Sequence, residues 1–248
     1  MNATGIITVS ACPTATITDN GMNTYNTVSI GTQCWMKENL RVRRYNDGTE
    51  IRFDNSGDVL GTTSQTWAGT GREYGAFTIY ANDSTGTPSN LTSYGYLYNW
   101  YAAKGIYKTG VIVSTDTLNI CPSGWHVPSD SDWNKLVIFI DSGTPAADTT
   151  ITGTQSTTAG GMLKSTLLWA SPNTGATNPS VFSALPGDYR ESTGRFFRLG
   201  TRTFFWSATE YDTTAAWHRV LYNNSGTVDR LNTIITKSFG ASVRCLRD

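Results

Sequence analysis

The chain has few charged residues and no long run of one sign. Lys, Arg, Asp and Glu make up 15% of its 248 residues, and the formal net charge is zero. Soluble domains average about 25% charged residues. The densest basic cluster, residues 41–44, is typical of a solvated strand end. Because nucleic-acid binding requires clustered Lys and Arg, we expect no nucleic-acid partner.

Long apolar runs are also absent. The apolar run at 136–140 is far shorter than the roughly 20 residues of a membrane-spanning helix, so the sequence predicts no membrane insertion. The first residues lack the basic and apolar regions of a secretory signal peptide. A secreted protein of this kind has lost its signal or leaves the cell by another route, for example inside a virion.

The four cysteines and two histidines show no CxxC pair and no zinc-ligand spacing, so we expect no metal site and no cofactor. Two disulfides in an oxidising, extracellular setting are the favoured interpretation. Three pairings can be drawn. We favour Cys12–Cys34, which closes a short loop, and Cys121–Cys245, which ties the middle of the chain to its end. Four free thiols are the alternative.

Helical patterns are scarce, and Thr, Ser, Asn and Gly dominate much of the chain. The clearest predicted helix runs from Ser129, a good N-cap, to about Asp141. A second is predicted over 94–103 and a short turn over 161–165. Apolar runs predict strands at 28–30 and 51–53, and residues 141–160 are predicted to form a surface loop.

Strands and helices do not alternate regularly along the chain, which predicts the α+β class. We expect two main helices, short strands and long loops. The predicted organisation is an N-terminal extension, 1–11, followed by one domain, 12–248.

The segment from 204 to the end is the most informative. As a strand, 217–222 places its odd-numbered residues on one face and its even-numbered residues on the other. A half-buried strand alternates apolar with polar residues. Here the face expected to point outward carries Val220 and Tyr222. Apolar side chains on an outer surface indicate contact with a partner. The alternative is that the rest of the domain covers both faces.

Six spaced motifs occur in a fixed order. They are IGTQCWMKENL at 30–40, YGYLYNW at 94–100, CPSGWHVPS at 121–129, LPGDYR at 185–190, FWSATE at 205–210 and SVRC at 242–245. With these motifs the chain resembles the Fibrobacter succinogenes major paralogous domain family, common in Bacteroidetes and their phages, over 12–248. The resemblance implies a C-type lectin-like fold of the formylglycine-generating-enzyme type.

Members of that family serve as surface proteins, and some resemble variable proteins of diversity-generating retroelements, akin to the phage major tropism determinant. Those proteins rewrite chosen C-terminal codons on a fixed scaffold. The resemblance implies a variable region at 204–241 above a scaffold that includes Trp206, Trp217, Leu221 and Val243. Ala241 stands where the resemblance leads us to expect an aromatic. The implied exposed, ligand-binding residues are Phe204, Tyr211, Thr213, His218, Val220, Tyr222, Asp229, Leu231, Thr233, Ile234 and Ile235.

Candidate chemistry is sparse. Calcium requires six to eight oxygen ligands, and neither an acidic cluster nor the sugar-binding tripeptides of calcium-dependent lectins occur. No GxSxG motif is present. We interpret His126 as a structural residue and the tryptophans as core rather than as a sugar-stacking platform. The sequence therefore predicts a protein that is not an enzyme.

The expected function is binding of a host-surface receptor or another macromolecule, by an adhesin at the cell surface or by a phage-tail protein on a virion. Homo-oligomerisation stays open. One alternative is a structural appendage without a specific ligand, and a second is an enzyme of the formylglycine-generating type.

Overall fold

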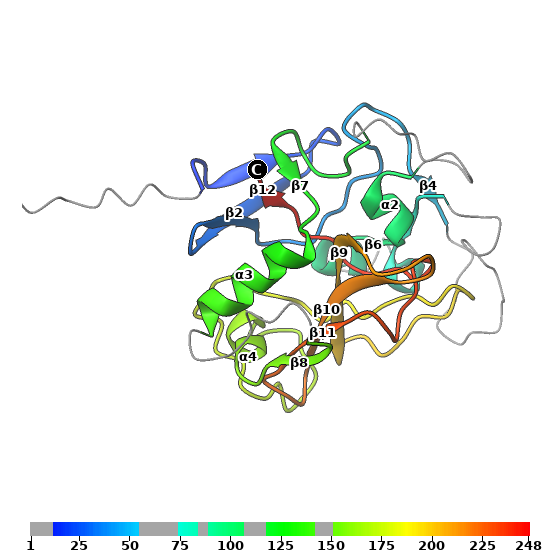
Figure 1. Cartoon of the computed structure of the whole chain (residues 1–248). Helices are drawn as coiled ribbons and strands as arrows, with labels where there is room; N and C mark the ends of the chain where they lie inside the picture. The colour runs from blue at the N-terminus through cyan, green and yellow to red at the C-terminus, as the bar shows by residue number, and fades with distance from the viewer. Residues whose placement is uncertain (1–11, 55–73, 84–88, 107–117, 142–150) are drawn as a thin grey trace, which may run out of the picture.

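The computed structural model describes residues 12–54, 74–83, 89–106, 118–141 and 151–248. Within these ranges, three sheets and four short α-helices make up a mixed α+β architecture (Figure 1). The predicted α+β class is confirmed. The predicted extension, 1–11, lies outside the described residues. No helix in the described ranges is long and apolar enough to cross a membrane.

The first sheet joins early and late parts of the chain. Its strand order is β1-β2-β3-β12-β7, with antiparallel neighbours throughout. The strands are β1 (Thr16–Thr18), β2 (Thr24–Ile30), β3 (Gln33–Met36), β7 (Trp125–His126) and β12 (Leu246–Arg247). Leu246 pairs with Trp35 of β3 and with His126 of β7, so the last strand lies between two earlier ones (Figure 1).

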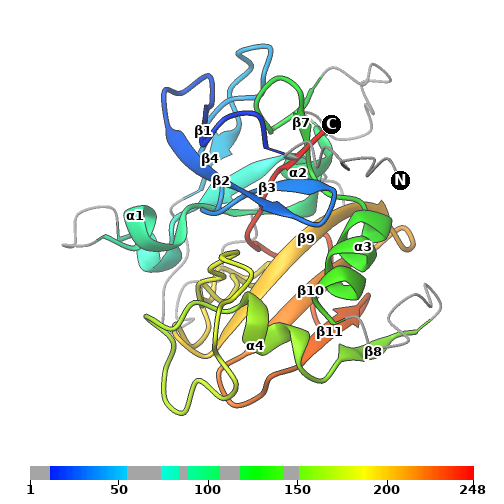
Figure 2. The same ribbon diagram turned by 90° about the vertical axis from the view of Figure 1, so that its left-hand side faces the viewer.

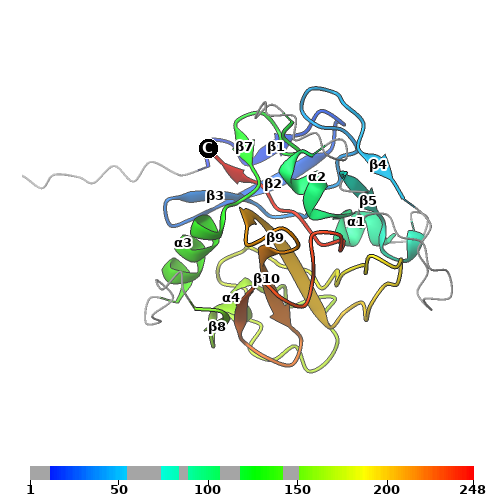
Figure 3. The same ribbon diagram turned by 45° about the vertical axis from the view of Figure 1, so that its right-hand side comes forward.

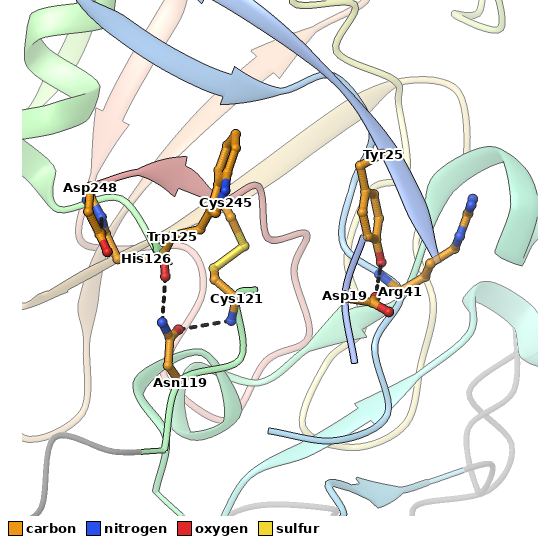
Figure 4. Close-up of a disulfide and its surroundings, with 9 residues drawn as sticks. All are labelled: Asp19, Tyr25, Arg41, Asn119, Cys121, Trp125, His126, Cys245 and Asp248. Atoms are coloured by element: carbon orange, nitrogen blue, oxygen red, sulfur yellow. Dashed lines mark hydrogen bonds and ion pairs between the residues drawn. A yellow bond between two sulfur atoms is a disulfide. The ribbon is translucent and has the colours of Figure 1, made fainter. Parts of the chain in front are cut away.

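Two disulfides fasten this sheet, and both predicted pairings are confirmed. Cys12 bonds Cys34 across 22 residues of sequence, and Cys121 bonds Cys245 across 124 residues. Figure 4 shows the second bond beside Asn119, whose side-chain oxygen accepts from the Cys121 N–H at 2.9 Å. In the chain-entropy model, a loop of that length contributes about 4–5 kcal/mol. Two disulfides indicate folding in an oxidising, extracellular environment.

The second sheet has the order β8-β11-β10-β9 and is antiparallel. Its strands are β8 (Gly153–Ser156), β9 (Arg202–Glu210), β10 (Ala216–Tyr222) and β11 (Val228–Leu231). Helices α3 (Asp130–Ile140) and α4 (Ala159–Leu163) lie across one face (Figure 2). Trp133 and Leu163 of these helices pack into one core with Phe205 and Leu221 of the sheet.

Helix α3 begins as predicted. Ser129 is its N-cap and accepts from the Asp132 N–H, while the Asp132 carboxylate accepts from the Ser129 N–H. This reciprocal capping box satisfies two backbone donors at the helix start. The helix therefore has a fixed N-terminus, which holds Asp130 against the second sheet.

The opposite face of the second sheet meets the rest of the domain. The third sheet has the order β4-β5-β6, with β4 parallel and β6 antiparallel to β5. Its strands are β4 (Arg52–Phe53), β5 (Ala76–Thr78) and β6 (Leu97–Tyr98), and near them lie α1 (Asn90–Tyr94), α2 (Trp100–Lys104) and the 3-10 turn η1 (Tyr80–Asn82). Figure 3 shows the segment from β11 to β12 running past β9 on its way back to the first sheet.

Two sequence-based boundaries are wrong. The predicted helix 94–103 is interrupted by Gly95 at φ 74° and by β6, and helix resumes only after Asn99. The Asn99 side chain accepts from the N–H groups of Ala76 and Ala102, so it ends one element and caps the next. The predicted loop 141–160 contains β8 and the start of α4 in its described part. Expected strands at 28–30 and 51–53 fall on β2 and β4, and the short helical turn forms at 159–163.

Candidate binding surface

Strand β10 alternates between two faces as predicted, but both faces are covered. It lies between β9 and β11, with Arg219 opposite Phe205 and Arg230, and Val220 opposite Phe204 and Asp229. Cross-strand partners point to the same side of a sheet. The odd-numbered residues therefore face α3 and α4. The even-numbered residues face the larger core, which contains buried residues of β3, β5, β6 and α2. We call residues 218–222 of β10 and 228–231 of β11 the middle of the sheet.

A buried charge cluster fills the helix-facing side of the middle. The Asp130 carboxylate accepts from Arg219 Nη1 at 2.8 Å and from Arg230 Nη2 at 2.7 Å, and all three side chains are buried. Arg219 also donates to the side chains of Gln155 and Asn134. Burial lowers the pKa of Arg219 to about 10, and Asp130 opposes that shift. The polar residues of this face are thus scaffold, held by α3.

The expected exposure of the other face is wrong. Val220 packs in the larger core with Trp206, and the segment that follows β11 supplies further covering residues. His218 is buried, its Nδ1 donates to the Ala216 carbonyl at 3.1 Å, and burial lowers its pKa to about 4. The predicted ligand-binding residues that are buried are Phe204, His218, Val220, Leu231 and Ile235.

Tyr222 and Asp229 occupy the edge of the same face and are half-buried. The Tyr222 hydroxyl donates to Asp229 Oδ2 at 2.8 Å. Burial and that hydrogen bond raise the pKa of Tyr222. These two residues are partly accessible. The Tyr222 hydroxyl already has its partner, whereas Asp229 Oδ1 is buried without a hydrogen-bond partner in the described part of the chain.

Exposed side chains gather where the sheet ends. We call residues 211–214, between β9 and β10, and 233–236, after β11, the tip. Tyr211 and Ile234 are each 54% exposed, and Thr213 and Thr233 are exposed as well. The tip thus contains four of the predicted ligand-binding residues in the predicted exposed state.

Trp217 lies beneath the tip and departs from the prediction that it is buried. It is half-buried at a register shift between Ala216 and His218. The Tyr211 ring meets it edge-on at 5.3 Å, and the Arg230 guanidinium lies 3.4 Å from its ring centroid. The indole therefore connects the exposed tip to the buried charge cluster. The other three predicted scaffold residues, Trp206, Leu221 and Val243, are buried as expected.

Local hydrogen bonds fix the backbone of the tip. Asp212 Oδ1 accepts from the N–H groups of Thr214 and Ala215 at 2.7 and 2.8 Å. Lys237 joins the two segments, because its N–H donates to the Thr214 carbonyl and its ammonium pairs with Glu210. An Asp two residues before a Thr is a turn signal that could have been read from the sequence. Lys237 gave no such signal.

The remaining candidate groups have structural partners. The His126 ring contacts Asp248, beside it in Figure 4, through Nδ1 at 2.5 Å. It also contacts Asp132 through Nε2 at 3.4 Å. The hydrogen bond with Asp132 raises the pKa of His126. No group of three or more His, Cys, Asp or Glu in the described ranges is arranged to hold a metal ion. Ala241 is buried and pairs with Tyr98 through the backbone.

Comparison with known proteins gives a family for this arrangement. A family model described as the Fibrobacter succinogenes major domain matches residues 28–247. No match was found among the curated proteins or among the solved structures. The matched range contains all six sequence motifs, the three strands β9, β10 and β11 that flank the tip, and three of the four disulfide-bonded cysteines. The chain belongs to the Fibrobacter succinogenes major domain family.

Proposed function

We propose that this chain is an extracellular binding module that contacts a protein receptor through the tip. The observation that carries the proposal is the exposure of Tyr211 and Ile234 on a backbone held by Asp212 and Lys237. Tyrosine offers a large contact area at a low cost in conformational entropy. A backbone that is already ordered reduces the entropy lost on binding. Threonine hydroxyls around the two anchors supply hydrogen bonds at the rim.

The proposal includes a setting and a fold. We place the module at a cell surface or on a virion, supported by the two disulfides. We also infer a C-type lectin-like fold, supported by the family and by the mixed architecture. An experimental structure superposed on a formylglycine-generating enzyme tests the fold. A different strand order in the second sheet would contradict it.

The burial pattern restricts the positions at which the sequence can vary without disturbing the core. Changes at His218, Val220 or Ile235 would alter the core, whereas Tyr211, Thr213, Thr233 and Ile234 have open surroundings. We therefore propose the tip as the place where sequence variation is tolerated. Sequencing the gene and its neighbourhood tests this. A reverse transcriptase gene, with a near-copy of the codons for 204–241 that differs at tip codons, is the expected finding.

Binding is tested by placing a charge on the tip. We expect Ile234→Asp to reduce adhesion of the labelled protein to a panel of bacterial cells, with a melting temperature no lower than that of the parent chain, because Asp tolerates the left-handed backbone at this position better than Ile does. The matched control is Leu167→Asp, since Leu167 is also an exposed aliphatic residue but lies outside the tip. An equal loss of adhesion in both variants would contradict a specific role for the tip.

A structural module without a specific ligand is the second candidate. The burial of β10 on both faces favours it, because the sequence pattern that indicated a broad contact surface is explained by core packing. Under this alternative, well-folded protein adheres to none of the cells, and tip variants behave like the parent chain.

A non-enzymatic role is part of the proposal. Cys121 and Cys245, the candidates for a redox reaction, are joined in a disulfide (Figure 4). Mass spectrometry of the alkylated, non-reduced protein tests this. Recovery of alkylated Cys121 and Cys245 would return the formylglycine-generating alternative to consideration.

A further inference from the structure

We propose a second binding site, for an anionic saccharide, in a pocket beside β4. The pocket has a volume of about 640 Å³, within the range of roughly 300–1,000 Å³ that is usual for small-ligand sites. It shares no residue with the tip. Its charged and aromatic lining residues among the described residues are Arg43, Arg44, Glu50, Arg52, Tyr74 and Phe53, with Phe77 in the floor.

The pocket has an excess of positive charge. Three arginines face one glutamate among its described lining residues. Arg44 pairs with Glu50 at 2.5 Å, and Arg52 lies 3.8 Å from the Asp54 carboxylate. No carboxylate in the described part of the chain lies in ion-pair distance of Arg43. At least one guanidinium is therefore available to a negatively charged ligand.

Arg43 is held in position with donors to spare. Its Nε donates to the hydroxyl of Tyr96, a buried residue, at 2.7 Å. That bond fixes the plane of the guanidinium and leaves its two Nη groups free to donate. A planar pair of N–H donors matches the geometry of a carboxylate or a sulfate. Arg43 is thus the residue we assign to the anionic group.

Aromatic rings give the pocket a second property. Phe53 is 46% exposed, and its ring lies 5.3 Å from that of Phe77, which is buried. The Tyr74 ring is stacked under Arg52, with 5.0 Å between guanidinium and centroid. A ligand that matches both the positive charge and the aromatic rings has a flat apolar face and an anionic group in the same molecule. A pyranose ring with a carboxylate or sulfate has both, whereas an acidic peptide uses the charge alone.

Direct binding measurements test this proposal. The probes are trigalacturonic acid, which carries carboxylates, and a heparin-derived tetrasaccharide, which carries sulfates, with neutral maltotriose as the reference. We expect one or both anionic probes to bind in calorimetry in the presence of EDTA, more weakly at higher salt, and maltotriose to show no binding. Binding of all three with equal affinity would overturn the proposal, as would binding of none. Tighter binding of hexaglutamate than of both anionic probes would assign the pocket to acidic peptides instead.

Three variants locate the site. Arg43→Gln should weaken binding about tenfold, the usual effect of losing one charge-assisted contact. Arg41→Gln is the matched control, because Arg41 belongs to the same basic cluster but stacks on Tyr25, outside the pocket. Phe53→Ala should weaken saccharide binding and leave binding of inorganic sulfate unchanged. Equal effects of Arg43→Gln and Arg41→Gln would overturn the assignment. The tip variant Ile234→Asp should bind the saccharide normally, which separates this site from the receptor surface.

Discussion

The middle of the second sheet and the tip beside it have opposite surroundings. In the middle, β10 is buried on both faces, by α3 on one side and by the larger core on the other. At the tip, the connections that follow β9 and β11 carry the exposed residues Tyr211 and Ile234. The difference shows that burial and exposure are separated along the strands rather than across them, so the proposed receptor contact and the support of the fold fall at different ends.

The largest loss of stability is expected when the buried charge cluster on the helix-facing side of the middle is disrupted. Asp130→Ala leaves the buried guanidiniums of Arg219 and Arg230 without their carboxylate. Removing one partner of a buried ion pair costs about 3–5 kcal/mol. Chemical denaturation measures the change. The tip control, Asp212→Ala, loses only the turn hydrogen bonds of a solvent-exposed side chain, so we expect a much smaller change in stability. Comparable losses would mean that middle and tip do not differ in their contribution to stability.

The two histidines should respond to pH in opposite directions. The folded pKa of His218, about 4, lies below its ordinary value, so the unfolded chain binds this proton more tightly. Its contribution is complete above pH 6.5 and is lost as pH falls toward 4, on the order of 3 kcal/mol. The pKa of His126 is raised by Asp132, so its contribution is present below pH 6.5 and is lost as pH rises through the folded pKa.

Proton NMR of the two imidazole rings checks the direction of both pKa shifts. We expect the His218 signal to stay in its neutral position until the pH is well below 6, and the His126 signal to titrate above its ordinary pKa. A His218 signal that titrates near pH 6.5 would place the ring in solvent and restore the exposed-face interpretation.

A smaller effect is expected from trimming side chains. Val220→Ala removes buried methyl groups from the larger core and should cost about 2 kcal/mol. Thr213→Ala at the exposed tip should change stability by less than about 0.5 kcal/mol. Thermal melts of the two variants, paired in one buffer, measure the contrast. Equal melting temperatures would show that Val220 is not a core residue.

The smallest expected change in stability is an increase rather than a loss. Ile234 has φ 71°, a backbone conformation that disfavours branched side chains. Glycine adopts it without strain but is more flexible when unfolded. Ile234→Gly should therefore stabilise the fold by about 0.5–1 kcal/mol while weakening receptor adhesion. Destabilisation by this change would indicate that the Ile234 side chain packs against the domain.

The features that could be predicted from the sequence are mainly local ones. Ser129 and Asp132 are three residues apart, so the start of α3 follows from the capping pattern alone. The pairing of Cys121 with Cys245 is long-range, but with four cysteines only three pairings exist. In both cases the residues themselves leave few alternatives.

The burial of β10 could not be predicted in the same way. The alternation of side chains along a strand shows which residues share a face, but not which part of the protein covers that face. Arg219 is buried because Asp130, 89 residues earlier, neutralises it. His218 is buried against the rings of Phe204 and Trp206, and Val220 lies in one core with Ile235 from the segment after β11. A Tyr or Val on a strand has the same sequence signature whether a receptor or the chain itself covers it.

The position of β12 has a consequence for the order in which the molecule can be built. Leu246 pairs with both β3 and β7, so the first sheet stays open until Leu246 has been synthesised, more than 200 residues after β3. Early strands that emerge from the ribosome have no partner on that side, and long-range pairings of this kind form slowly. The edges of β3 and β7 stay unpaired until β12 forms between them. The disulfide between Cys121 and Cys245 then links the two parts of the chain covalently.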